Sequence, residues 1–123
     1  MAHFFLYAVG ERQELPAFLA TYAPGPPWAE PWSGQVDVKG YSAARAALRL
    51  VLEHDRLSAM LEQAVRFGGD TDTVAAIALG VASCRRDVQN DLPQRLLLSL
   101  EAGTYGREFL RDLDRQLLNL VNH

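Results

Sequence analysis

Apolar residues recur along most of the chain at the three- and four-residue spacing of amphipathic helices. This spacing predicts helices over residues 2–9 and 14–22, a third that starts near Ser42 and a fourth that starts near Leu57. Each would bury one apolar stripe. The expected stripes of the second, third and fourth helices are Leu15, Phe18, Leu19 and Tyr22; Ala44, Ala47, Leu48, Val51 and Leu52; and Leu57, Met60, Leu61, Ala64 and Val65.

The second half of the chain continues the helical pattern. A strongly apolar stretch from Val74 to Cys84 predicts a buried helix, and Asp91 is expected to cap a helix that runs through Ala102 to Gly103. A final helix carries one apolar face, formed by Leu110, Leu113, Leu117, Leu120 and Val121. The alternation that is typical of strands appears nowhere in the sequence. We therefore predict an all-α bundle of six or seven helices that forms a single domain over residues 1–123.

One irregular connection interrupts this pattern, at about residues 24–40. It holds four of the six prolines and three of the nine glycines. Trp28 and Trp32 lie within it, and two interpretations of them stay open: they stack on an adenine or ribose face, or they cover the open side of the bundle. A loop of this length is usually functional or a linker.

Charge, cysteine content and hydropathy limit the partners and the cellular location that we expect for the protein. The net charge is −3, and Lys39 is the only lysine, so a phosphate-backbone track is not expected and nucleic acid is excluded as an electrostatic partner. Cys84 is the only cysteine, which fits a small core residue in a reducing, cytoplasmic protein. The apolar patch at residues 4–9 is too short to span a bilayer, so we expect neither a signal peptide nor a membrane anchor.

The candidate chemistry lies at residues 68–73, which read Gly-Gly-Asp-Thr-Asp-Thr. The two glycines permit a tight turn, and the acidic cluster would then sit at the N-terminus of the following apolar helix, where anionic side chains are favoured. Carboxylate and hydroxyl oxygens are ligands that Mg²⁺, Mn²⁺ or Ca²⁺ prefer. Two carboxylates placed close together also repel each other unless a cation or solvent relieves the repulsion.

Three other interpretations apply to these residues. Asp and Thr are ordinary helix caps, so a purely structural role stays open. The nucleophile motif of haloacid dehalogenase phosphatases requires an apolar strand directly before its first Asp. Here a helical stripe and a glycine pair precede Asp70, so this interpretation is not favoured. A calcium loop of the EF-hand type is excluded because Val74 and Ala75 stand where an oxygen ligand and Gly are required.

Residues 68–78, Gly-Gly-Asp-Thr-Asp-Thr-Val-Ala-Ala-Ile-Ala, resemble the C-terminal signature of the ADP-ribosylglycohydrolase family. The Ala-rich segment at residues 42–48, the Asp-Leu-Pro at 91–93 and the segment at 100–110 extend the resemblance, which covers most of the chain from about Trp32. It implies an orthogonal helical bundle like the C-terminal half of that fold. It also implies a binuclear Mg²⁺ or Mn²⁺ centre, with Asp70, Asp72 and Thr73 as metal ligands, and hydrolysis of ADP-ribose conjugates at the ribose anomeric carbon.

The chain also departs from the family pattern. The family draws further metal ligands and a catalytic acid from a cluster in its N-terminal half, and this sequence has no such cluster; its other neighbouring acids, Glu53/Asp55 and Asp112/Asp114, lie in helical patterns typical of solvated surface. No catalytic residue is therefore assigned. Two hypotheses follow: an ADP-ribosylglycohydrolase-like enzyme that is weak or incomplete in this chain alone, or a truncated, non-catalytic homologue that acts as an interaction module. Both favour a homo-oligomer or pairing with a chain that supplies the missing half.

Overall fold

The computed structural model describes residues 1–121, which form seven α-helices and one short 3₁₀ helix. This confirms the all-α prediction. Within these residues the only β-type pairings are two isolated bridges, Val36 with Gly69 and Arg56 with Gln89. The helices are α1 (Ala2–Leu6), η1 (Arg12–Glu14), α2 (Leu15–Tyr22), α3 (Gly40–Glu53), α4 (Leu57–Phe67), α5 (Thr71–Ala82), α6 (Gln94–Leu98) and α7 (Arg107–Val121).

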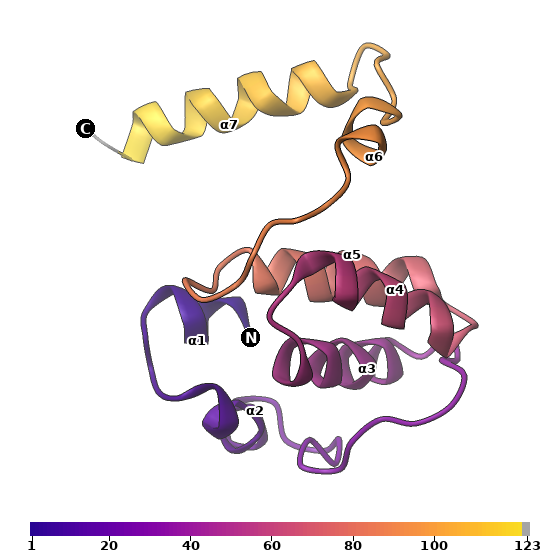
Figure 1. The fold of residues 1–123 in the computed structure, drawn as a ribbon. Coiled ribbons are helices and arrows are strands. Elements are labelled where there is room, and N and C mark those ends of the chain that lie inside the picture. The colour runs from indigo at the N-terminus through magenta and orange to yellow at the C-terminus, as the bar shows by residue number, and fades with distance from the viewer. Residues whose placement is uncertain (122–123) are drawn as a thin grey trace. The chain divides into compact units, whose positions relative to one another are not determined.

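The chain divides into two compact units, Met1–Asp91 and Leu92–His123. In the first unit α3, α4 and α5 pack against one another, and α1 contacts α5 (Figure 1). Phe4, Leu15, Leu50, Met60 and Val74 are the large apolar side chains at the centre of this unit, each at most 1% exposed. No described helix is both long and apolar enough to cross a membrane.

The predicted stripes are right in period but not in every member. On α3 the buried set includes Ala43, Ala46 and Leu50 as well as Ala47, Leu48 and Val51, whereas the predicted Ala44 and Leu52 are only half-buried. This helix is covered on more than one side, so a single stripe underestimates its buried surface. On α4 the prediction of Val65 is wrong, because its side chain is 62% exposed and Phe67 is buried instead.

Three predicted boundaries are also wrong. The first helix stops at Leu6, since Ala8 takes a positive φ of 48° that an α-helix cannot accommodate. The apolar stretch expected to end at Cys84 is helical only to Ala82, and Cys84 is half-buried beyond that helix. The helix expected from Asp91 through Ala102 shortens to the five residues of α6.

Asp91 does cap a helix, but a different one from the helix predicted. Its carboxylate accepts hydrogen bonds from the backbone N–H of Ser58 (2.9 Å) and the Ser58 hydroxyl (2.5 Å), and it pairs with Arg56 (2.6 Å). These contacts satisfy the first turn of α4 from a residue far along the sequence. They lower the pKa of Asp91 far below its ordinary value, the Ser58 hydroxyl contributing most and its backbone N–H next.

Candidate metal centre

A turn of two glycines joins α4 to α5, as the sequence predicts. Gly68 and Gly69 follow Phe67 with φ angles of 72° and 78°, in the region that glycine enters without steric cost. The turn brings Asp70 to the N-cap position of α5 and Asp72 into its first turn. Val74, which is fully buried, anchors the start of this helix in the core. The acidic cluster is therefore held at the end of a well-packed helix.

The side chain of Asp70 does not perform the ordinary capping role. In the part of the chain that the structure describes, this carboxylate accepts no capping hydrogen bond from the first turn of α5. Asp70 is half-buried and Asp72 is exposed. Since an unmodified N-cap aspartate would normally accept such a bond, the pure capping interpretation loses its main support.

The two carboxyl groups interact with each other. Hydrogen bonding with the Asp70 side chain is the largest cause of a lowered pKa at Asp72, followed by the backbone N–H groups of Thr73 and of Asp72 itself. Two carboxylates this close together in the chain are suited to hold a cation, because a cation relieves their mutual repulsion. Thr73 lies three residues after Asp70, on the same side of the first turn. The donor chemistry of Asp70, Asp72 and Thr73 therefore fits part of the shell of a hard divalent cation.

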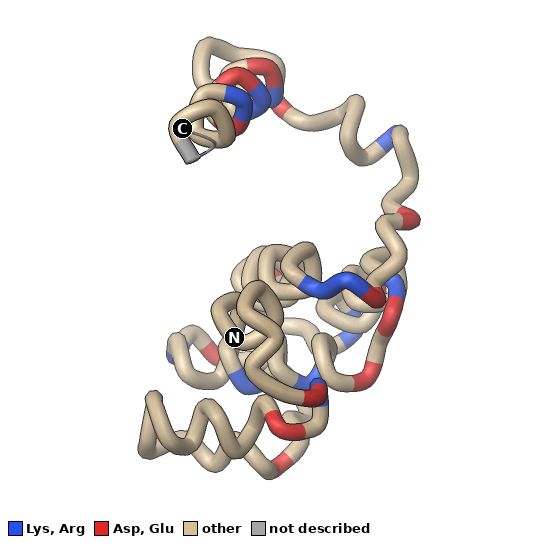
Figure 2. Tube along the Cα trace, turned by 90° about the vertical axis from the view of Figure 1, so that its left-hand side faces the viewer, with Lys and Arg blue, Asp and Glu red and all other residues tan. Residues whose placement is uncertain are grey.

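The remainder of such a shell is not found among residues 1–121. Within residues 1–121 no three His, Cys, Asp or Glu side chains come together in a group that could hold a metal ion. The other acidic pairs are engaged with arginines: Glu53 with Arg49 (2.9 Å), and Asp112 with Arg115 (3.0 Å) on α7, where acidic and basic positions adjoin along the trace (Figure 2). The described residues thus contain no complete metal-binding group.

The backbone of the glycine turn is held by a segment that sequence reasoning did not single out. The N–H of Val36 donates to the carbonyl of Gly68 (3.0 Å), and the N–H of Asp70 donates to the carbonyl of Val36 (3.1 Å). A Cβ atom on Gly69 would lie 2.0 Å from the Val36 carbonyl oxygen. The required glycine at 69 is visible in the sequence, but its partner is not, because Val36 lies in the irregular connection.

A buried arginine was also missed. The Arg85 side chain is fully buried and donates to the carbonyls of Val51 (3.0 Å) and His54 (2.7 Å). It also pairs with Asp55 (2.8 Å) and Asp87 (2.7 Å) and holds the pKa of both carboxyls below its ordinary value. All of these partners are within the first unit, so Arg85 joins the end of α3 to the segment after α5. Its position directly after an apolar helix is the only sequence signal.

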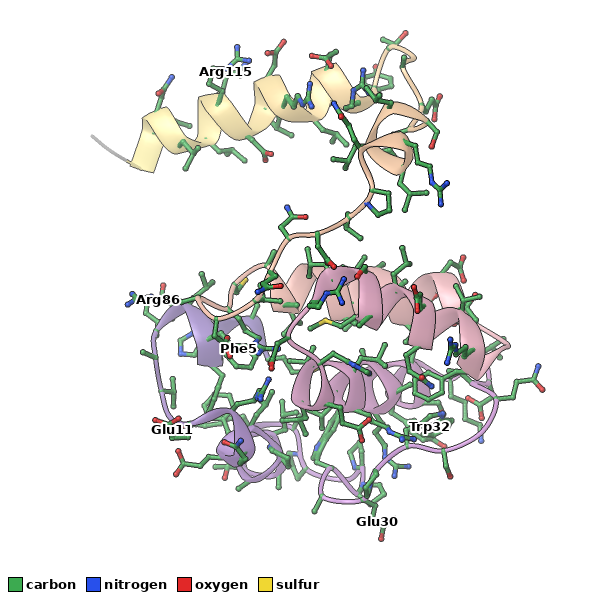
Figure 3. The ribbon with its side chains drawn as sticks, viewed as in Figure 1. Phe5, Glu11, Glu30, Trp32, Arg86 and Arg115 are labelled. Atoms are coloured by element: carbon green, nitrogen blue, oxygen red, sulfur yellow. The ribbon has the colours of Figure 1, made fainter. Side chains whose placement is uncertain are left out.

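The surroundings of Trp28 and Trp32 distinguish between their two interpretations. Trp28 is 8% exposed and its indole N–H donates to the carbonyl of Ala23 (2.8 Å), so its ring is part of the core. Trp32 lies beside α3 (Figure 3), where the guanidinium of Arg45 sits 5.3 Å from the ring centre. Both rings line a cavity of about 80 Å³. Sites for drug-sized ligands are about 300–1,000 Å³, so this cavity is too small for an adenine base and its sugar, which favours the covering role.

Residues 7–123 match the family model described as ADP-ribosylglycohydrolase. The chain belongs to the ADP-ribosylglycohydrolase family. This match confirms the resemblance drawn from the glycine–aspartate motif, and it places the chain in a family of generally metal-dependent hydrolases. Comparison with curated proteins and with solved structures gave no match.

Proposed function

We propose that Asp70, Asp72 and Thr73 form one half of a Mg²⁺ or Mn²⁺ centre for the hydrolysis of ADP-ribose conjugates at the ribose anomeric carbon. The observation that carries this proposal is the pair of carboxylates at the start of α5, where the Asp70 side chain accepts no capping hydrogen bond. Family membership supplies the reaction class. A bound divalent cation would orient the ribose hydroxyls and activate the attacking water.

The residues of this chain have defined parts in such a centre. Asp70 and Asp72 carry the negative charge that attracts a cation, and they lie at the N-terminus of α5, where anionic side chains are favoured. Thr73 adds a neutral hydroxyl oxygen without adding charge. The buried Val74 and the bonds from Val36 keep these donors on a rigid support.

The remaining ligands and the catalytic acid are proposed to come from a second polypeptide, either another copy or a chain that carries the N-terminal part of the family fold. The absence of a third metal-binding side chain near Asp70 and Asp72, within residues 1–121, supports this proposal. The same observation favours the second candidate function, a non-catalytic homologue that acts by association. The two functions differ in whether free ADP-ribose is released after the second chain is added.

Calorimetric titration with Mn²⁺ tests the half-site directly. We expect wild-type protein to bind Mn²⁺ weakly, with a dissociation constant on the order of 10⁻⁴ to 10⁻³ M, because only two carboxylates contribute. The Asp70→Asn/Asp72→Asn variant should lose this binding. The matched control is Asp112→Asn/Asp114→Asn, which removes the same charge from α7 and should leave binding unchanged.

Equal Mn²⁺ binding by the wild type and the Asp70→Asn/Asp72→Asn variant would overturn the proposed centre. Release of ADP-ribose from an ADP-ribosylated protein is then measured with this chain alone and after mixing with an N-terminal chain of the family. Release that requires both chains and is lost in the double variant supports the enzyme. If Mn²⁺ binds and mixing gives a stable complex without release, the non-catalytic function is the correct one.

A further inference from the structure

The acidic motif is fixed by contacts that come from outside its own helices. Val36 holds the carbonyl of Gly68 and the N–H of Asp70, so both sides of the glycine turn depend on the place of one residue in the loop before α3. Val36 is 2% exposed, which shows that the loop is packed firmly at this point. The direction of the Asp70 carboxylate follows from the backbone of this turn.

The same loop is fastened to α3 by an arginine. Arg49 donates from Nη1 to the carbonyl of Trp32 (2.5 Å) and from Nε to the carboxylate of Glu53 (2.9 Å). Its guanidinium also lies 5.8 Å from the centre of the Phe67 ring. Phe67 is the last residue of α4 and directly precedes Gly68. Arg49 therefore contacts both the end of α4 that leads into the acidic turn and the loop that pairs with this turn.

Further contacts hold Trp32 in place. Its indole N–H donates to the carbonyl of Gly34 (3.1 Å), which closes the chain into a short turn two residues before Val36. The ring is stacked by Arg45, whose Nη2 donates to the carbonyl of Glu30 (3.1 Å). The segment Trp32–Val36 is thus a short, constrained link between Arg49 and the glycine turn.

We propose that Arg49 is a positioning residue for the acidic motif, acting through Trp32–Val36 and Phe67 to set the backbone of Gly68–Asp70. This inference rests on the proposed metal centre for its functional meaning. Arg49 itself is neither a ligand nor a catalytic residue. A planar guanidinium is suited to the task, because it donates in two directions while one face lies over an aromatic ring.

Charge alone makes the opposite prediction, which gives the proposal a clear test. Removing a positive charge near a cation site should strengthen cation binding, since one repulsive interaction is lost. Loss of positioning should weaken binding instead, by about tenfold, as is common for groups that orient metal ligands. The two explanations therefore differ in sign.

The experiment compares Arg49→Leu with Arg66→Leu. Arg66 lies at the end of α4, 73% exposed and 4.0 Å from Glu62, so its replacement removes the same charge near the same turn without touching Trp32 or Val36. Mn²⁺ titration should give about tenfold weaker binding for Arg49→Leu and unchanged or slightly tighter binding for Arg66→Leu. Arg49→Lys, which retains the charge and one donor direction, should be intermediate. Equal affinity of Arg49→Leu and the wild type, or tighter binding, would overturn the proposal.

A second measurement needs no metal. Amide hydrogen exchange should show protection lost by about tenfold at Asp70 and Val36 in Arg49→Leu, while Ala78, in the middle of α5, keeps its protection. A parallel loss at all three amides indicates general destabilisation, and no loss at any of them indicates no link; either result refutes the positioning role. If wild-type protein does not bind Mn²⁺, the proposed centre fails, and the exchange pattern still decides whether Arg49 sets the turn.

Discussion

Replacing Gly69 with alanine tests the link between the irregular loop and the acidic turn. The structure gives two separate costs. Gly69 has a φ of 78°, and a left-handed backbone costs a residue with a Cβ about 1–2 kcal/mol. The new Cβ would also lie 2.0 Å from the carbonyl oxygen of Val36, a distance that forces the two segments apart.

Separation of these segments weakens the two backbone hydrogen bonds that Val36 makes to Gly68 and Asp70. Each bond contributes about 0.5–1.5 kcal/mol net. Together with the backbone strain, Gly69→Ala should lower the free energy of unfolding by about 2–5 kcal/mol. This is a large part of the stability of a small domain.

Urea denaturation followed by tryptophan fluorescence measures the effect, because Trp28 and Trp32 both lie in the unit Met1–Asp91. Gly80→Ala is the matched control. Gly80 is exposed on α5 with open space around its Cα, so alanine there should stabilise the helix by about 0.5–1 kcal/mol. If Gly69→Ala unfolds within about 0.5 kcal/mol of the wild type, the contact with Val36 does not constrain the turn.

Two further predictions concern the ion pairs of the first unit. Arg85→Met should lower the free energy of unfolding by about 3 kcal/mol in urea denaturation, because it leaves the carbonyls of Val51 and His54 without their side-chain donor. The exposed neighbour, tested as Arg86→Met, should change the free energy of unfolding little, and equal effects would contradict the role given to Arg85. The pKa of Asp91 is lower in the folded state, so its contribution to stability is present above the ordinary value of 3.8 and is lost as the pH falls below it. Thermal unfolding from pH 7 to pH 2 should therefore show a smaller acid-induced drop in Asp91→Asn than in the wild type, and an identical drop would refute the cap at Ser58.

The helices and the motif were accessible from the sequence because both depend on local spacing. The apolar period predicts α2, α3, α4 and α7, and two adjacent glycines before Asp70 predict a turn that opens a helix. The family could be recognised for the same reason, since its signature is one continuous segment. The predicted ligands Asp70, Asp72 and Thr73 belong to that segment, and their metal binding stays a prediction.

The predictions of single residues failed where contacts between distant segments decide the cap or the buried side chain. Asp91 was expected to cap its own helix, but in the tertiary structure it is placed beside Ser58 and satisfies the start of α4. Val65 was expected in the core because it fits the period, but its side chain is exposed and Phe67 is buried instead. Local spacing does not indicate which face of a helix meets its neighbours.

The sequence by itself therefore determined the fold class, the family and the position of the acidic turn, because helix period and turn chemistry act over a few residues. Only the tertiary structure decided what holds that turn. Val36 reaches it through backbone atoms, which any residue could supply, and Arg49 reaches it through the carbonyl of Trp32 and the ring of Phe67. Such contacts join residues far apart in the chain and leave no pattern in the sequence, since their geometry exists only after α3, α4 and α5 have packed together.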